Sequence, residues 1–148
     1  MSFTQKVQAT TPAASVILIR LMVGAVFLSE GIQKFLFADQ LGVGRFAKIG
    51  LPEPQLLAPM AASFEIVCGA LVILGWFTRL AALPLLAVIG TAIITTKLSM
   101  LTHDGFWKTA HEGRADYAML LGLIYLLIVG GGSWSADAAA RGGGTSAK

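Results

Sequence analysis

Apolar residues are concentrated in four stretches of the chain, at residues 15–37, 56–77, 80–98 and 115–134. Each stretch has the roughly 20 mostly apolar residues that a helix needs to cross about 30 Å of hydrocarbon. None shows the polar–apolar alternation that is typical of a membrane β-strand. The pattern therefore predicts an all-α fold, a membrane-embedded four-helix bundle. Because the number of spans is even, both termini are expected on the same side of the membrane.

The segments between these stretches predict the domain boundaries. Pro12 precedes the first span, which is too long and too charged for a cleaved signal peptide. Only Thr78 and Arg79 separate the second span from the third, so these two helices are expected to be antiparallel neighbours, and Pro84 is expected to kink the third. We therefore expect an N-terminal segment at 1–14, a four-span transmembrane domain at 15–137 and a flexible C-terminal tail at 138–148.

Charged residues make up only 13% of the 148 residues, whereas hydrophobic residues make up 55%. A typical soluble domain has about 25% charged residues. This composition argues against a soluble enzyme, a disordered chain and a nucleic-acid-binding protein, and it predicts contact with a lipid bilayer. The basic residues are scattered and divide five against six between the two sides, so they do not decide the orientation. The single cysteine, Cys68, excludes an internal disulfide and a CxxC pair.

Several ionisable residues fall inside the predicted spans, where charged groups are costly and are candidates for function. With a rise of about 1.5 Å per residue, Glu30 lies roughly 10 Å and Glu65 roughly 13 Å below the side opposite the termini. Lys34, Lys97 and Asp116 lie near the ends of their spans on that same side. Ionisable groups from all four helices are therefore expected in one half of the bilayer.

Helical spacing places small residues and charges on one face of three spans. These faces comprise Arg20, Gly24, Phe27, Gly31 and Lys34 in the first span, Ala58, Ala62, Glu65, Gly69, Val72 and Trp76 in the second, and Asp116, Leu120, Leu123, Leu127, Gly130 and Trp134 in the fourth. Small residues allow close helix approach and charges avoid lipid, so the faces are predicted to turn inward. Two simpler interpretations stay open: Lys34 and Lys97 snorkel to the interface, and Arg20 is purely structural.

The connection at residues 102–114 adds little chemistry. His103 and His111 lack the i,i+4 spacing of a helical zinc site, so we expect a solvated interfacial loop and no metal site. No pair of histidines lies at membrane depth and the chain has no glycine-rich nucleotide motif, so neither haem nor a nucleotide is predicted. Thr91 and Thr95 can bond to their own helix or to a neighbouring one.

Several short motifs occur in order over about residues 15–138. They are Arg20-Leu21, Gly24, Phe27 and Gly31-Ile32-Gln33-Lys34-Phe35, then Gly50-Leu51-Pro52, Glu65, Gly69, Leu71, Leu74-Gly75 and Thr78-Arg79-Leu80-Ala81-Ala82, and finally Gly113, Asp116-Tyr117-Ala118, Gly130, Gly132-Ser133 and Ser135-Ala136-Asp137. Together they resemble the DoxX family of small four-helix membrane proteins. Glu30 and Asp116 depart from the family pattern, in which histidine and glutamate are common at these positions.

The resemblance implies a subunit of a membrane oxidoreductase system, with thiosulfate:quinone oxidoreductase as the namesake association. Other members are tied to oxidative-stress or thiol-redox complexes, and many have no assigned activity. It also implies a bacterial inner-membrane protein with both termini in the cytoplasm. Glu30 puts any histidine-dependent chemistry of the family in doubt for this chain.

The residues and the resemblance together favour a quinone-linked subunit whose electron carrier is supplied by a partner oxidoreductase subunit. A quinone head group needs groups that form hydrogen bonds and exchange protons at membrane depth. The predicted catalytic residues are Glu65, Glu30 and Lys34, and the predicted cofactor-binding residues are Arg20, Phe27, Trp76 and Asp116. A homo-oligomer is the alternative to a partner subunit. Two other functions stay open: a non-catalytic membrane anchor or assembly subunit of a larger complex, and a small-solute carrier that uses Glu65 and Arg20.

Overall fold

A computed structural model describes residues 3–142, and the regular structure of these residues is entirely helical. The elements are α1 (Phe3–Val7), α2 (Val16–Leu36), α3 (Val43–Lys48), α4 (Pro54–Leu74), α5 (Thr78–Ala92), the π-helical segment η1 (Ile93–Lys97), α6 (Leu98–Asp104), α7 (Phe106–Glu112), α8 (Arg114–Val129) and α9 (Ala136–Gly142). The all-α fold class that the sequence predicts is confirmed.

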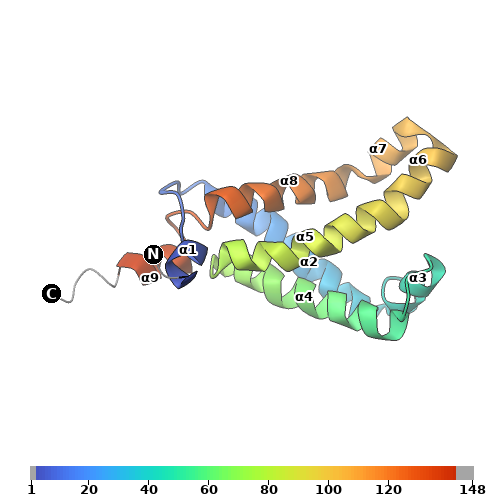
Figure 1. Cartoon of the computed structure of the whole chain (residues 1–148), viewed down its shortest axis with the longest axis horizontal. Helices are drawn as coiled ribbons and strands as arrows, with labels where there is room; N and C mark the ends of the chain where they lie inside the picture. The colour runs from blue at the N-terminus through green and yellow to red at the C-terminus, as the bar shows by residue number, and fades with distance from the viewer. Residues whose placement is uncertain (1–2, 143–148) are drawn as a thin grey trace.

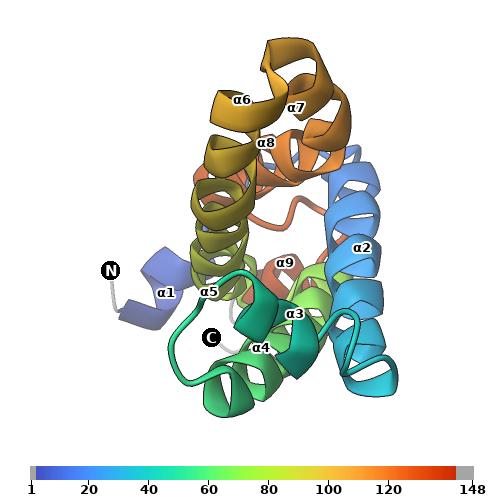
Figure 2. The ribbon, with the colours of Figure 1, turned by 90° about the vertical axis from the view of Figure 1, so that its right-hand side faces the viewer.

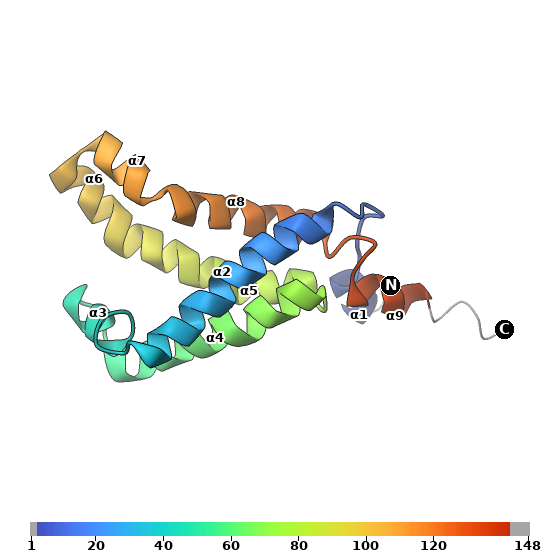
Figure 3. The ribbon, with the colours of Figure 1, turned by 180° about the vertical axis from the view of Figure 1, so that it is seen from behind.

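Four long helical segments form a ring (Figures 1 and 2). Along this ring α2 packs on α4, α4 on α5, α5 on α8, and α8 on α2. The short helices α1 and α9 lie at one end of the ring, which we call the near end, and α3, α6 and α7 lie at the far end (Figures 1 and 3). The contact between α4 and α5 confirms that the second and third apolar stretches are neighbours.

Three helices within the described residues are long and apolar enough to cross a membrane: α2, α4 and the continuous helix Thr78–Asp104 that α5, η1 and α6 form. Large apolar side chains cover their outer faces, among them Leu18, Val67 and Ile94. These apolar outer surfaces agree with the expectation that the chain is an integral membrane protein. The fourth span stays a prediction, because α8 has only 16 residues.

Gly24 and Gly69 allow α2 and α4 to approach closely. A Cβ atom on Gly69 would lie 2.9 Å from the backbone nitrogen of Leu28 and 3.0 Å from the carbonyl oxygen of Gly24. A Cβ atom on Gly24 would lie 2.8 Å from the carbonyl oxygen of Gly69. The two backbones therefore touch where neither residue has a side chain, as is common for helices packed in membranes.

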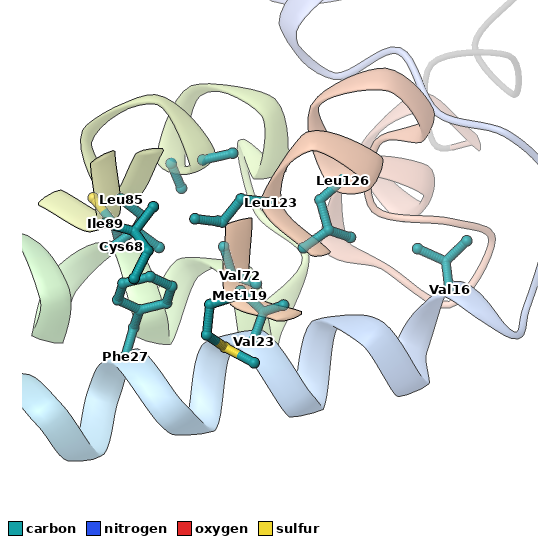
Figure 4. Packing of buried hydrophobic residues seen from close by; sticks show 12 residues of the cluster. Val16, Val23, Phe27, Cys68, Val72, Leu85, Ile89, Met119, Leu123 and Leu126 are labelled. Atoms are coloured by element: carbon teal, nitrogen blue, oxygen red, sulfur yellow. The ribbon is translucent and has the colours of Figure 1, made fainter. Parts of the chain in front are cut away.

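A hydrophobic core fills the centre of the ring (Figure 4). Its buried members come from α2, α4, α5 and α8: Val16, Val23, Phe27, Cys68, Val72, Ala81, Ala82, Leu85, Ile89, Met119, Leu123 and Leu126. Along α2, Val23 and Phe27 lie between Arg20 and Lys34, and along α4, Cys68 and Val72 lie between Glu65 and Gly75. The core therefore separates the polar groups of the near end from those of the far end.

The third apolar helix differs from the sequence-based expectation. It runs past residue 98 to Asp104, and Pro84 lies within α5 without interrupting it. The helix also contains the π-helical segment η1, which begins nine residues after Pro84 in the sequence, and the kink expected at Pro84 stays a prediction. Where the sequence predicts a loop over 102–114, the structure has the end of α6 and all of α7, separated by Gly105 at φ 84°. The segment between Gly105 and Gly113 contains no glycine or proline, so it can form two helical turns.

The C-terminal segment also differs in part from the expectation. The sequence predicts a flexible tail from residue 138, but α9 includes residues 138–142. The Ser135 hydroxyl accepts a hydrogen bond from the Ala138 N–H at 3.1 Å, which caps the start of this helix. The rest of the expected tail, residues 143–148, lies outside the described residues.

Candidate functional site

The far half of the ring encloses a cavity of about 730 Å³. Its walls come from α2, α3, α4, α5, η1 and α8, together with the end of α7. This volume lies within the roughly 300–1,000 Å³ that is typical of small-molecule sites. The cavity is the main candidate for a functional site within the part of the chain that the structure describes.

One wall of the cavity carries a buried ion pair between α2 and α4. The Lys34 Nζ atom lies 2.7 Å from Glu65 Oε2 and 3.0 Å from Glu65 Oε1. The Glu65 side chain is 3% exposed and the Lys34 side chain 12% exposed. Glu30, one helical turn before Lys34, lies 3.6 Å from the same ammonium and is half exposed. Pairing offsets the cost of placing these charges away from water, and Glu30 connects the pair to the more open side.

A second ion pair lies on the wall formed by η1 and α8. The Lys97 Nζ atom is 3.3 Å from Asp116 Oδ2, and it donates a hydrogen bond to the carbonyl oxygen of Glu112 at 3.1 Å. Both side chains line the cavity. Lys97 is the last residue of η1, whose π-helical turn positions it towards α8. Single π-helical turns within α-helices are frequent at functional sites.

The remaining lining of the cavity is largely apolar. Phe27 of α2, Met60 and Phe64 of α4, and Met119 of α8 contribute side chains from the four-segment ring. The segment around α3 adds further lining residues, namely Leu41, Arg45, Phe46, Ile49 and Leu51. The site thus combines two ion pairs with aromatic and flexible apolar surfaces, which suits a planar, moderately polar molecule.

Arg20 lies outside this cavity, at the near end of the ring. Its guanidinium group donates to the carbonyl oxygens of Val72 at 3.0 Å and of Ile73, both in the last turn of α4. It also donates to the carbonyl oxygens of Gly131 at 3.0 Å and of Trp134. The last carbonyl groups of a helix have no partner within the helix and carry partial negative charge. Arg20 satisfies two of them and ties α4 to the segment that follows α8.

Asp137 makes the corresponding cap at the start of α5. Its carboxylate accepts hydrogen bonds from the backbone N–H of Phe77 at 2.8 Å and of Thr78 at 3.1 Å, and from the Thr78 hydroxyl at 3.1 Å. Asp137 is 1% exposed. The residue at the N-cap of α5 is Phe77, whose side chain cannot accept a hydrogen bond, so α9 supplies the acceptor from a distant part of the chain.

The structure brings five of the seven predicted site residues to one cavity. They are Glu65, Glu30, Lys34, Phe27 and Asp116. It places the other two elsewhere: Arg20 is buried among backbone carbonyl groups, and Trp76 is 47% exposed at the near end. Trp76 leaves the predicted face because α4 ends at Leu74 and Gly75 adopts a left-handed conformation, with φ 68°. The roles of all seven residues stay predictions.

The other expectations about helix faces and side-chain partners agree with the structure only in part. Lys34 and Lys97 both form ion pairs rather than extending freely to the interface. Thr91 and Thr95 donate to carbonyl oxygens of their own helix, at 2.9 and 2.7 Å. On α8, Leu123 from the predicted face is buried, but Trp134, which lies beyond the end of α8, is exposed. Within residues 3–142 no group of three or more His, Cys, Asp or Glu side chains is placed to hold a metal ion.

The sequence alone did not reveal three parts of this arrangement. It placed Lys97 near the end of a span without a partner, and it did not include α3 in the site. It also left Asp137 just beyond the last span, although Asp137 is among the residues that carry the family resemblance. That resemblance was the one signal in the sequence that pointed to Asp137.

The model of one protein family matches residues 15–98, which is more than half of the chain; this family is DoxX. The chain belongs to the DoxX family. The part matched to DoxX contains Glu30, Lys34, Glu65 and Lys97, whereas Asp116 lies beyond it. The lining residues of the cavity that come from α2, α3, α4, α5 and η1 therefore fall within the DoxX match, whereas those from α7 and α8 do not.

Three curated relatives of this DoxX protein cover most of its length. The "Uncharacterized membrane protein Rv3486" of Mycobacterium tuberculosis is 55% identical over 129 residues, which are 83% of this chain and 79% of the relative. The "Putative oxidoreductase CatD" of Bacillus subtilis is 32% identical over 77% of this chain and 78% of its own length. The "Inner membrane protein YphA" of Escherichia coli is 32% identical over 80% of this chain and 84% of its own length. No solved structure matches the chain.

Proposed function

We propose that this DoxX protein binds a quinone head group in the far-end cavity and serves as the membrane subunit of an oxidoreductase system. The observation that carries the proposal is the Lys34–Glu65 ion pair, which joins two helices long enough to cross a membrane and lies on the wall of an otherwise largely apolar cavity. A quinone ring offers carbonyl oxygens that accept hydrogen bonds, and Lys34 is a donor. The apolar part of the ring fits against Phe27, Phe64 and Met119.

The three charged residues also suit the proton balance of quinone chemistry. Reduction of a quinone to a quinol takes up two electrons and two protons, and oxidation releases them. The Lys34 ammonium and the Glu65 carboxylate are a donor and an acceptor in direct contact, 2.7 Å apart. Glu30 is half exposed and within 3.6 Å of Lys34, so it is placed to exchange protons between this pair and the solvent.

The electrons in this proposal come from a carrier on a partner oxidoreductase subunit. The name of the relative from Bacillus subtilis, which contains the word oxidoreductase, supports this assignment. In this arrangement the partner carries the redox group, and the membrane subunit binds the lipid-soluble quinone.

We also propose that α8 is the fourth membrane span. At about 1.5 Å per residue α8 is roughly 24 Å long, and the segment up to Trp134 extends it towards the near end. α8 packs along α5 and α2 and joins α7 at the far end to α9 at the near end (Figure 1). Both termini then lie on one side, which we place in the cytoplasm as the family resemblance implies. The name of the relative from Escherichia coli supports a location in a bacterial inner membrane.

Glu65→Gln tests the proposed site. The change removes the carboxylate charge but keeps the side-chain length, so the quinone pocket retains its shape while the proton acceptor is lost. We expect quinone-linked turnover in membranes that contain the partner to fall at least about 100-fold, the lower end of the range for loss of a proton-transfer group. Turnover is measured as quinol formation with a water-soluble 1,4-benzoquinone analogue.

Glu53→Gln is the matched control, because Glu53 is exposed at the start of α4 and lies outside the cavity. It should leave turnover unchanged. Unchanged turnover in Glu65→Gln would instead favour the non-catalytic alternative, an anchor or assembly subunit. The pairing of both lysines with carboxylates supports that alternative, because paired charges can serve only to hold the bundle together.

A further inference from the structure

The far-end cavity contains two lysines on different walls, and both keep a free donor. Lys34 comes from α2 and Lys97 from η1. An ammonium group has three N–H donors. Lys34 pairs with two carboxylates, Glu65 and Glu30, and Lys97 directs its donors at the carboxylate of Asp116 and the carbonyl of Glu112. Lys34 lies within hydrogen-bond distance of both Glu65 oxygens, whereas its 3.6 Å contact with Glu30 is too long for a hydrogen bond. Lys97 has two acceptors, so among the described residues each ammonium has a third donor that no short contact uses.

We propose that Lys97 is a second ligand-binding residue, and that the cavity recognises a ring with oxygen atoms at opposite ends, one held by Lys34 and the other by Lys97. This inference rests on the proposed function and deepens it, because it selects para-quinones over ring ligands with one oxygen. Asp116 and the Glu112 carbonyl act as positioning groups, since they hold the Lys97 ammonium at the cavity wall.

The backbone of η1 supports this role for Lys97. η1 is a five-residue π-helical segment within the otherwise α-helical Thr78–Asp104. The insertion of a π-helical turn changes the direction of the side chains that follow it relative to those before it. Thr95, Thr96 and Lys97, the last three residues of η1, all line the cavity.

The charge balance of the two walls also fits an uncharged ligand with two acceptors. Lys34 is paired with two carboxylates, Glu65 and Glu30, and Lys97 with one, Asp116, so neither wall carries the net positive charge that would select an anion. Recognition then depends on hydrogen bonds from the two ammonium groups, which are stronger than those between neutral groups. A site built to bond a ligand oxygen discriminates strongly against an analogue that lacks it.

The test compares two uncharged ligands in purified protein reconstituted in lipid nanodiscs. One is 2,3,5-trimethyl-1,4-benzoquinone, which has two opposed carbonyl groups, and the other is 4,4-dimethylcyclohexa-2,5-dienone, which has one. Binding is measured by equilibrium dialysis for the wild type, Lys34→Met and Lys97→Met. Lys48→Met is the matched control, because Lys48 is exposed and does not line the cavity.

We expect Lys97→Met to weaken quinone binding about 10- to 100-fold, the usual effect of losing a hydrogen bond to a charged group. The dienone should be affected little by Lys97→Met, because it can still bind with its one oxygen at Lys34. Lys48→Met should change neither ligand. If Lys97→Met does not fold, the double variant Lys97→Met/Asp116→Leu removes both charges together and should give the same selective loss.

The possible results separate this inference from the proposed function. Quinone binding that depends on Lys34 but not on Lys97 would overturn the two-ended site and leave the quinone proposal standing. An equal loss of both ligands in Lys97→Met would also overturn it, because the effect would not be specific to the second oxygen. If the wild type binds neither ligand, the proposed function fails and this inference fails with it.

Discussion

Arg20 is held by carbonyl groups from two distant parts of the chain, and this arrangement favours the structural interpretation of Arg20 that the sequence leaves open. It donates to the last turn of α4 and to the 131–134 segment, and it is 2% exposed. A Cβ atom on Gly75 would lie 2.6 Å from Arg20 Cζ, so the glycine at the end of α4 also makes room for the guanidinium group. The planar guanidinium group has five donors and can form hydrogen bonds with both segments at once, whereas the compact ammonium group of a lysine cannot.

We therefore expect Arg20→Lys to lower the free energy of unfolding by at least about 2 kcal/mol, since hydrogen bonds to charged groups contribute about 1.5–3 kcal/mol each. The measurement is the midpoint of thermal unfolding in detergent. Arg141→Lys in α9 is the control, because Arg141 is exposed, and it should leave the midpoint unchanged. Quinone binding of Arg20→Lys should match the wild type below its unfolding temperature. Loss of quinone binding with an unchanged midpoint would restore the ligand-binding role that the sequence predicts for Arg20.

At the scale of elements, the contact between α2 and α4 positions the Lys34–Glu65 pair. The two residues lie on different helices, and their side chains meet because Gly24, Gly31 and Gly69 let the helices pack backbone to backbone. A methyl group at Gly69 would meet backbone atoms, which cannot rotate away. The helices would have to separate to accommodate it.

Gly69→Ala should therefore destabilise the protein by about 1–3 kcal/mol, the usual cost of overpacking. Gly90→Ala makes the same change in α5, where a Cβ atom would meet no atom within 4 Å. It should leave stability unchanged or raise it slightly, because alanine favours helix over glycine by about 1 kcal/mol. Thermal unfolding of the two variants provides the comparison. Equal midpoints would show that α2 and α4 can move apart without cost.

At the scale of the whole molecule, the cavity and the near-end polar groups are separated by the hydrophobic core. Val23, Val72 and Leu123, all fully buried, lie between them. The cavity lining comes from the far half of the ring and includes α3. The cavity should therefore exchange water and protons with the far side of the membrane alone.

Cysteine labelling tests both this sidedness and the fourth span. In a Cys68→Ala background we expect Ala61→Cys in the cavity and Ala110→Cys in α7 to react with a membrane-impermeant maleimide from the same side. Ala139→Cys in α9 should react from the opposite side. The reagent is added to intact cells and to inverted vesicles. Labelling of residues 110 and 139 from one side would mean that α8 does not cross the membrane, and labelling of residue 61 from the side of residue 139 would contradict the far-side opening.

The sequence by itself determined the class of the protein and much of its local structure. Three of the four apolar stretches are helices long enough to cross a membrane, and the fourth contains α8. The inward position of Glu65 and the glycine contacts also followed from helical spacing. These properties depend on hydrophobic length and on a period of 3.6 residues, and both are present in any short window of the chain.

Only the tertiary structure decided which charges meet. Lys34 pairs with Glu65, Lys97 with Asp116, and Arg20 with carbonyl groups near residue 131, and in each case the partners come from different helical segments. Trp76 left its predicted face because of the left-handed turn at Gly75, and η1 changed the direction of Lys97 within a helix for which the sequence predicts only a kink at Pro84. The rotation of each helix depends on how it packs against its neighbours, and that packing involves residues far apart in the sequence.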